Sequence, residues 1–581
     1  MNPAEEPRKR RNYDAFQSSR DRSISPPPKR RAFDFNGRPG GKEVVALRVD
    51  NPAASSTMSS NNSKNACKSA KESTKPQSRT LFPSPVQLNF VEQLPASSNA
   101  NCVSLGGILG DPMIKECWLF NYLFDIDFVM RHFDPDTRDI VQVRVVHGSW
   151  KREDPNGIHI EEAAKRYPNI KVTKAFMPEM FGTHHTKAMV LFRHDDLAQV
   201  VILTANFIER DFRMSQAMWR TPLLPLEIPR RSSSDPLPLL SSGLRFKHDL
   251  LAYFQGYSRN GIASLLDLVS QLQEYDFSAV RGALIGSLPG LQMPGQFGPE
   301  DQERLGRWGL PALKRILSSI PSNSILSSDP NPEPQIIAQV SSIASVGEKW
   351  FRTTLMPTLS TMAPVQKPLP KPKISIIFPT ASTIRHSIDG YTSGSFIHMK
   401  TTTPTQAKQL SFLKPMLCHW SIHPTLLPNN PTNHQEPTKK TGRATAAPHI
   451  KTYLRFTDAS LTHIDWAMLT SANLSTQAWG SSPNAGGEVR ICSYELGVVV
   501  WPALWDAPGT LGVASMVPVF GGDLPTEADD DGLGKDGPVV GWRMPYDLPL
   551  VPYGADEKPW CATEACDEPD WMGRVWPGYG R

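Results

Sequence analysis

Hydrophobic positions begin to recur regularly along the chain only after about residue 85. Before that point the sequence is mainly Ser, Asn, Lys and Pro, so we expect residues 1–85 to form a disordered basic tail. A dense aromatic and aliphatic stretch at 118–125 then predicts the first core element. Apolar runs at 140–146 and 200–204 predict buried strands, and 160–166 predicts a helix between them. This alternation favours an α/β layered fold.

The second half of the chain repeats this pattern less regularly. Strand-like runs recur at 374–378, 466–470 and 495–500. A Gly- and Pro-rich stretch at 286–298 predicts a boundary, which gives an N-terminal domain over 86–290 and a C-terminal domain over 291–581. We expect two further stretches, 423–447 and the acidic 523–536, to be inserted loops without regular structure.

Length and composition are consistent with two folded units in a soluble protein. A chain of 581 residues exceeds the size of one hydrophobic core, and 39% hydrophobic with 20% charged residues is typical of globular proteins. No apolar run approaches the ~18 residues of a membrane span, and the N-terminus opens on charges, so we expect an intracellular protein without a membrane partner. The seven cysteines are scattered and odd in number, which predicts free thiols and no zinc site.

The positive charge of the protein is concentrated in the predicted tail. Residues 1–50 contain 12 Lys and Arg against 7 Asp and Glu, an excess that equals the formal net charge of +5 for the whole chain. Basic clusters at 8–11 and 29–31 indicate a nuclear-import signal or a nucleic-acid contact. We therefore expect the protein in the nucleus.

Two short segments carry the same chemical groups. His185 and Lys187 are separated by one residue, and Asn206 follows 21 residues after the histidine. His449 and Lys451 have the same separation, and Asn473 follows 24 residues after that histidine. On a strand, side chains two residues apart share a face, so each His and Lys should point the same way. The asparagines follow the next predicted strands, Asn206 after 200–204 and Asn473 after 466–470, so they should reach the same edge.

Two such sets facing each other suit phosphodiester cleavage without a metal or other cofactor. The lysines would neutralise the non-bridging phosphate oxygens and the asparagines would donate hydrogen bonds to them. One imidazole would attack phosphorus and form a phosphohistidine, while the other donates a proton to the leaving oxygen and later activates water. The symmetry of the motif leaves open which histidine attacks.

A third His-x-Lys, at His398 and Lys400, lacks the rest of the pattern. It is followed by Thr401-Thr402-Thr403-Pro404, with no strand that ends in Asn at the required spacing. About one such tripeptide is expected by chance in a chain of this composition. We therefore assign it no catalytic role.

The two complete motifs place the chain near a known family. Together with segments 120–122, 146–148, 341–345, 470–475, 493–497 and 545–549, they resemble the tyrosyl-DNA phosphodiesterases that act at 3′ DNA ends, a branch of the phospholipase D superfamily. The resemblance implies two α-β-α sandwich domains related by a pseudo-twofold axis. It also implies that His185 is the nucleophile and His449 the general acid and base.

The resemblance implies that the substrate is a 3′-phosphotyrosyl bond between single- or double-stranded DNA and a peptide from a stalled type IB topoisomerase. It also implies that the enzyme is a monomer and that the product is a 3′-phosphate. Glu495 matches the glutamate that orients the nucleophile, and Gln216 matches the glutamine near the acid/base histidine, one residue closer to Asp211 than the family spacing. Thr476 replaces a family Lys. The implied DNA or substrate contacts are Phe181, Tyr122, Ser342, Ser345, Ser471, Ser475 and Trp576.

Two alternatives remain at the level of the sequence. One is a superfamily enzyme that acts on phospholipids or ordinary DNA strands, although the superfamily's Asp after the Lys is absent from both motifs. The other is a non-catalytic protein that binds DNA ends, which would not need the complete set of six motif residues.

Overall fold

The computed structural model describes residues 79–149, 151–228, 238–257, 264–292, 306–322, 332–344, 346–364, 370–422, 438–506, 512–526, 529 and 537–579. Most of the predicted tail, including Cys67, lies outside these residues. Its last part is built into the fold: β1 (Leu81–Phe82) pairs in parallel with β19 (Val539–Arg543), which pairs with β18 (Ser515–Val519). The folded chain thus begins before the predicted boundary at residue 85.

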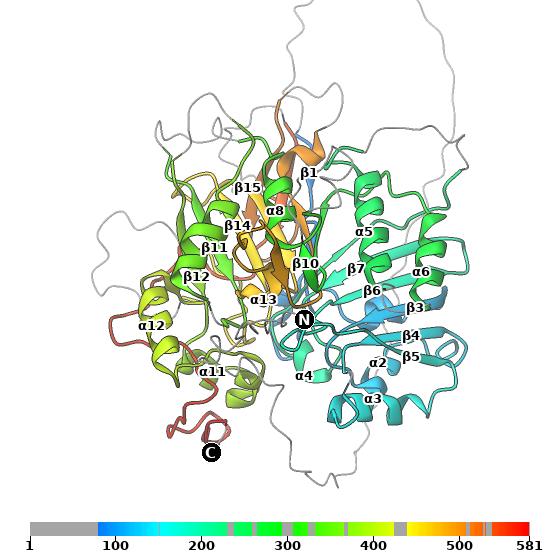
Figure 1. The fold of residues 1–581 in the computed structure, drawn as a ribbon, viewed down its shortest axis with the longest axis horizontal. Coiled ribbons are helices and arrows are strands. Elements are labelled where there is room, and N and C mark those ends of the chain that lie inside the picture. The colour runs from blue at the N-terminus through cyan, green and yellow to red at the C-terminus, as the bar shows by residue number, and fades with distance from the viewer. Residues whose placement is uncertain are drawn as a thin grey trace, which may run out of the picture. The chain divides into compact units, whose positions relative to one another are not determined.

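The first of two large sheets has seven strands. Their order is β2 (Val86–Leu88), β8 (Ala217–Arg220), β7 (Ala198–Leu203), β6 (Ala188–Arg193), β3 (Ile114–Phe120), β4 (Gln142–His147) and β5 (Ile170–Lys174). Alternate residues of β6 enter separate cores, since Met189 and Leu191 pack with helices α2 (Ile126–Met130) and α3 (Pro155–Ala164). Val190 and Phe192 instead share a core with α5 (Gly243–Tyr257) and α6 (Ser264–Gln273), which gives α-β-α layers (Figure 1).

The second sheet repeats this topology strand for strand. Its order is β9 (Ala283–Ser287), β17 (Glu495–Val500), β15 (Ile464–Thr470), β14 (Thr452–Phe456), β11 (Gln335–Gln339), β12 (Lys373–Ile377) and β13 (Leu417–Cys418). In both sheets the last three strands at one edge, β3-β4-β5 and β11-β12-β13, pair in parallel. The other four pairs of each sheet are antiparallel. The duplicated motif is therefore accompanied by a duplicated α/β fold, as expected.

The remaining elements are short, apart from α8 and α12. They are η1 (Ala96–Asn99), α1 (Gly106–Leu109), α4 (Glu209–Phe212), β10 (Gly290–Gln292), α8 (Gly309–Leu317), α9 (Glu348–Trp350), η4 (Phe351–Leu355), α10 (Met356–Leu359), α11 (Ala381–Arg385), η5 (Gly390–Phe396), α12 (Pro404–Leu413), η6 (Lys414–Met416), α13 (Thr476–Trp479), β16 (Val489–Ile491) and η8 (Pro502–Trp505). Within the described residues, no helix has the length and apolar character needed to cross a lipid bilayer.

The two sheets do not divide at residue 290. Strand β9 precedes that point but pairs with β17 of the second sheet, from Ser287 opposite Glu495 to Ala283 opposite Val499. All five residues of β9 are buried, so the pairing is anchored by core packing. The Gly- and Pro-rich composition that suggested a boundary therefore follows a core strand instead of separating two cores.

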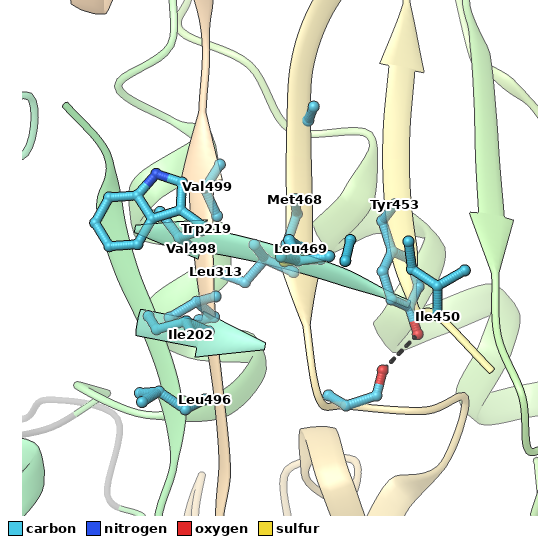
Figure 2. Packing of buried hydrophobic residues seen from close by; sticks show 14 of the residues in the cluster. Ile202, Trp219, Leu313, Ile450, Tyr453, Met468, Leu469, Leu496, Val498 and Val499 are labelled. Atoms are coloured by element: carbon cyan, nitrogen blue, oxygen red, sulfur yellow. Dashed lines mark hydrogen bonds between the residues drawn. The ribbon is translucent and has the colours of Figure 1, made fainter. Parts of the chain in front are cut away.

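One hydrophobic core spans both halves of the molecule. Ile202 of β7 and Trp219 of β8 belong to the first sheet and lie among side chains of the second (Figure 2). These neighbours include Met468, Leu469, Leu496, Val498 and Val499. Because this packing is continuous, the edges of the two sheets that carry the motifs are held in a fixed relation.

Parts of the two predicted insertions belong to the packed structure. Arg443 is fully buried and donates to the Asn89 carbonyl and side-chain oxygens, both at 2.9 Å, and to Ser215 Oγ at 3.3 Å. Asp523 is also buried and accepts a hydrogen bond from Arg543. Residues 423–437, 527–528 and 530–536 of these stretches lie outside the described part of the chain. The described residues 438–447 form no helix or named strand, as predicted, but they are not a solvated loop, because Arg443 and its neighbours pack into the fold.

Candidate active site

A cavity of about 270 Å³ opens where the two halves meet. Both predicted histidines, both predicted asparagines and Glu495 line it. The two motif lysines, Lys187 and Lys451, are fully buried beside it. The structure therefore brings the two sequence motifs, which are more than 260 residues apart along the chain, into one site.

Each His-x-Lys segment is anchored to both halves by its backbone. His185 N donates to the Tyr494 carbonyl at 2.9 Å, and His449 N donates to the Ser215 carbonyl at 3.2 Å, so each histidine is held by the opposite half. The lysines precede their strands directly, because β6 begins after Lys187 and β14 begins after Lys451. The predicted strands thus begin just after the catalytic side chains instead of containing them.

The imidazole of His185 is oriented by a carboxylate from the second sheet. Its Nδ1 lies 2.9 Å from Glu495 Oε2, which also accepts a hydrogen bond from Ser471 Oγ at 2.5 Å. Burial lowers the pKa of His185, and the neighbouring Glu495 opposes that shift. A neutral ring that donates Nδ1–H to Glu495 presents an unprotonated Nε2, the form a nucleophile requires.

The imidazole of His449 is held by side chains of the first half. Its Nδ1 lies 3.2 Å from Asp211 Oδ2 and 2.9 Å from Gln216 Nε2. A single ring nitrogen cannot donate to the carboxylate and accept from the amide at once, and the negative charge of Asp211 favours donation to the carboxylate. Burial lowers the pKa of His449 to about 3, against the opposing effect of Asp211.

The two asparagines are oriented by bonds to their carbonyl oxygens. Asn206 Oδ1 accepts from Lys187 Nζ, and Asn473 Oδ1 accepts from the backbone N–H groups of Ser341 and Ser342 at 3.0 and 2.9 Å. Within the described residues, no group accepts a hydrogen bond from either side-chain NH₂. Both amides are therefore able to donate to a ligand in the cavity.

The buried charges of the site favour an anion. Burial lowers the pKa of Lys187 to about 8, although Asp211 and Glu495 oppose the shift. Burial, followed by the positive charge of Lys187, lowers the pKa of Lys451 well below its ordinary value. A phosphate group bound between them would supply the missing negative charge and stabilise both ammonium groups.

Most of the other predicted contacts also lie at the cavity. Tyr122, Phe181, Ser342 and Ser475 line it, and Phe181 is 56% exposed at its rim. The Tyr122 ring lies edge-on to His185, and burial raises the Tyr122 pKa to about 12. Ser471 does not line the cavity; it donates a hydrogen bond to Glu495, which does.

Two of the predicted contact residues are not placed at the cavity. Ser345 lies outside the described residues. Trp576 does not line the cavity; its ring packs against Trp560 and Tyr579, and its Nε1 donates to the Ala562 carbonyl at 3.0 Å. Trp576 is partly buried and packed at this position, and its contact with substrate stays a prediction.

Sequence reasoning missed three residues of the site. Asp211 has no role predicted from the sequence, yet it is fully buried beside His449 and accepts a hydrogen bond from Asn206 N at 2.5 Å. Asn121 accepts from Lys187 Nζ at 3.0 Å, and the motif match at 120–122 was the available signal. His398, assigned to chance, lines the cavity. Thr476 begins α13 and is absent from the cavity wall.

All six described cysteines are free thiols, as predicted. Across the described part of the chain, no group of three or more His, Cys, Asp or Glu side chains is placed to hold a metal ion.

Two His-Lys-Asn sets, contributed by repeated sheets to one site, are the arrangement expected of a phosphodiester hydrolase. The sequence model of the family described as tyrosyl-DNA phosphodiesterase matches residues 85–554. The chain belongs to the tyrosyl-DNA phosphodiesterase family, whose members are phosphoric diester hydrolases.

Individual relatives agree with this assignment. The chain is 31% identical to "Probable tyrosyl-DNA phosphodiesterase" of Schizosaccharomyces pombe, over 86% of this chain and 97% of the relative. It is 28% identical to "Tyrosyl-DNA phosphodiesterase 1" of Arabidopsis thaliana, over 85% and 77% of the two chains. The crystal structure of the yeast tyrosyl-DNA phosphodiesterase shares the fold, with a TM-score of 0.54 and 20% identity over 82% of this chain and 99% of that one.

Proposed function

We propose that this protein hydrolyses the 3′-phosphotyrosyl bond between DNA and a stalled type IB topoisomerase, along with other 3′ adducts, and leaves a 3′-phosphate. The observation that carries the proposal is the pair of imidazoles at one cavity, each bonded through Nδ1 to a carboxylate of the opposite half. His449 Nδ1 also lies 2.9 Å from Gln216 Nε2, so the two histidines differ in their surroundings and can perform different steps of one reaction.

In the first step, His185 Nε2 attacks the phosphorus atom. A P–N bond forms, the bond from phosphorus to the tyrosyl oxygen breaks, and that oxygen leaves with the bonding electron pair. His449 in its protonated form donates a proton from Nε2 to the leaving oxygen. The negative phosphate favours protonation of His449, whose pKa burial otherwise lowers to about 3.

In the second step, the phosphohistidine is hydrolysed. His449 Nε2, now unprotonated, accepts a proton from water while the water oxygen attacks phosphorus. The P–N bond breaks, and its electron pair returns to His185. The product is a 3′-phosphate on DNA, and both histidines recover their starting protonation states.

The lysines and asparagines stabilise the charge that develops on phosphorus. Lys187 and Lys451 are buried on either side of the reacting group, and the amides of Asn206 and Asn473 donate to its non-bridging oxygens. Such fixed donors in a partly dehydrated site supply the largest share of transition-state stabilisation in phosphoryl transfer.

The DNA end would enter past the aromatic residues on the His185 side. Phe181, exposed at the rim, and Tyr122, edge-on to His185, suit stacking on an unpaired base of single-stranded DNA or of a frayed duplex end. The basic clusters at 8–11 and 29–31 support a nuclear location and additional contacts to the DNA backbone. We propose that the protein acts as a monomer, since one chain contributes both half-sites.

The direct test is turnover of an oligonucleotide with a 3′-phosphotyrosyl end, with product resolved by electrophoresis in the presence of EDTA. Release of a 3′-phosphate oligonucleotide supports the proposal, and His185→Ala should abolish it. His194→Ala, at an exposed histidine away from the cavity, is the matched control and should retain wild-type turnover. Absence of product with the wild type, or greater turnover of a phospholipid, would overturn the proposal.

A further inference from the structure

The third His-x-Lys of the chain forms part of the active-site wall. His398 lines the cavity together with Ser395 and Phe396, whereas Lys400 does not. The backbone of His398 is fixed on both sides, because its N–H donates to the Ser341 carbonyl and its carbonyl accepts from Ile343 N, both at 2.9 Å. The same Ser341–Ser342 segment orients Asn473, so His398 is tied to the catalytic framework.

Phe396 and His398 face the cavity together. Ile397 between them has extended backbone angles, φ −113° and ψ 119°, and its side chain is fully buried in the core. In extended backbone, residues two apart point to the same side, opposite to the residue between them. Two rings therefore stand next to each other on one wall of the cavity.

This wall lies on the side of the proton donor. The Phe396 ring lies edge-on to the His449 ring, with centroids 6.2 Å apart. The Tyr122 ring lies 6.5 Å from the His185 ring, so aromatic side chains flank both reacting histidines. If His449 protonates the leaving oxygen, a leaving group would lie beside Phe396, and His398 is the next ring on the same wall.

The chemistry of His398 suits contact with an uncharged aromatic ring. Burial, followed by the charges of Lys400, Lys451 and His185, lowers the pKa of His398 to about 4, so the ring is neutral near pH 7. Among the described residues, neither ring nitrogen of His398 has a hydrogen-bond partner. The ring is thus held in place by its backbone and is available to a ligand.

We propose that Phe396 and His398 form the subsite for a flat aromatic leaving group, with His398 as a specificity-determining residue. This inference rests on the proposed function. An aromatic group between the scissile oxygen and the rest of the adduct would pack against these two rings in offset or edge-on geometry. The subsite would favour aryl over alkyl leaving groups without contributing to hydrolysis of the phosphohistidine, because the leaving group has then departed.

The test compares two oligonucleotides that differ only at the 3′ leaving group, tyrosine or a short alkyl alcohol, in single-turnover reactions. His398→Ala should slow adduct formation on the tyrosyl substrate by about tenfold, the upper range for one aromatic contact, and change the alkyl substrate by less than about twofold. His398→Phe, which restores a ring, should return the tyrosyl rate to within about twofold of the wild type. Decay of the phosphohistidine should be the same in all variants.

Lys400→Ala is the matched control, because it alters the same tripeptide outside the cavity wall. Equal slowing of both substrates, slower decay of the adduct, or no change on either substrate would overturn the inference. A wild-type protein that fails on the tyrosyl substrate would instead reject the proposed function, so the two failures are distinguishable. Melting temperatures of the variants identify any loss of folding.

Discussion

Replacing Glu495 with glutamine isolates the contribution of one charge to the attack by His185. The carboxylate is 5% exposed, and its Oε2 lies 2.9 Å from His185 Nδ1. Glutamine keeps the size of the side chain and an oxygen that can accept the Nδ1–H hydrogen bond. The substitution therefore removes the negative charge while retaining the geometry.

The magnitude follows from the charge that the imidazole gains. When phosphorus bonds to Nε2, the His185 ring becomes a cation whose Nδ1–H is shared with Glu495. Opposite charges about 4 Å apart interact by about 4 kcal/mol at an effective dielectric constant of 20, and a neutral hydrogen bond retains about 1 kcal/mol. A net loss of about 2–4 kcal/mol in the transition state corresponds to adduct formation slowed by about 30-fold to about 1,000-fold.

The assay is rapid-quench measurement of adduct formation with enzyme in excess over a 3′-phosphotyrosyl oligonucleotide. Ser471→Ala serves as the comparison, because it removes one hydrogen bond to Glu495 Oε2 but leaves the carboxylate. It should slow the step less than Glu495→Gln does, because the carboxylate keeps its charge and its contact with His185. An adduct-formation rate of Glu495→Gln within about fivefold of the wild type would refute the electrostatic argument. A slower rate for Ser471→Ala than for Glu495→Gln would also refute it.

Three further predictions address the partner of His449, the packing of the nucleophile loop and the acid stability of the fold. Asp211→Asn should shift the neutral His449 proton to Nε2, so that the ring can no longer accept a proton from water. Decay of the adduct should slow by about 100-fold, measured in single-turnover reactions, and wild-type decay would contradict this role. Gly182→Ala would place a Cβ 2.0 Å from the Cys492 carbonyl oxygen and should lower stability by about 1–3 kcal/mol in denaturant unfolding. Gly347→Ala, where no atom lies within 4 Å, is its control, and equal stability of the two variants would reject the packing argument. Burial lowers the pKa of His449 to about 3 and of three other histidines to about 3 or 4, so below pH 6.5 the unfolded chain binds more protons than the folded one. Stability from these groups is fully present above about pH 6.5 and should fall as the pH drops toward 4, and a melting temperature independent of pH in that window would contradict the prediction.

Local sequence patterns were sufficient to predict much of the fold. The run Glu495-Leu496-Gly497-Val498-Val499-Val500 coincides with β17, because β-branched residues buried on both faces have few alternatives to a central strand. The ends of the predicted runs at 140–146 and 466–470 likewise agree with those of β4 and β15 to within two residues. The repeated His-Lys-Asn spacing also identified residues that the structure brings to one cavity.

Contacts between the two halves could not be predicted from local patterns. Asp211 lies in a short polar helix, and nothing near it in sequence shows that its carboxylate meets an imidazole 238 residues away. The place of β9 in the second sheet was missed for the same reason, since a strand's partner is set by tertiary packing. His398 was predicted to form no half-site, and the structure agrees. Its position in the cavity wall could not be predicted, because it depends on pairing with Ser342.

In the proposed mechanism His185 forms a covalent bond to phosphorus and His449 is needed to break it. The most direct test is intact-mass analysis of His449→Ala after incubation with a 3′-phosphotyrosyl oligonucleotide. We expect a protein species heavier by the mass of the 3′-phosphate oligonucleotide less one water, with tyrosine released. No such species should form when His185→Ala is combined with His449→Ala. Absence of the adduct from His449→Ala, together with full turnover by His185→Ala alone, would contradict these roles of the two histidines.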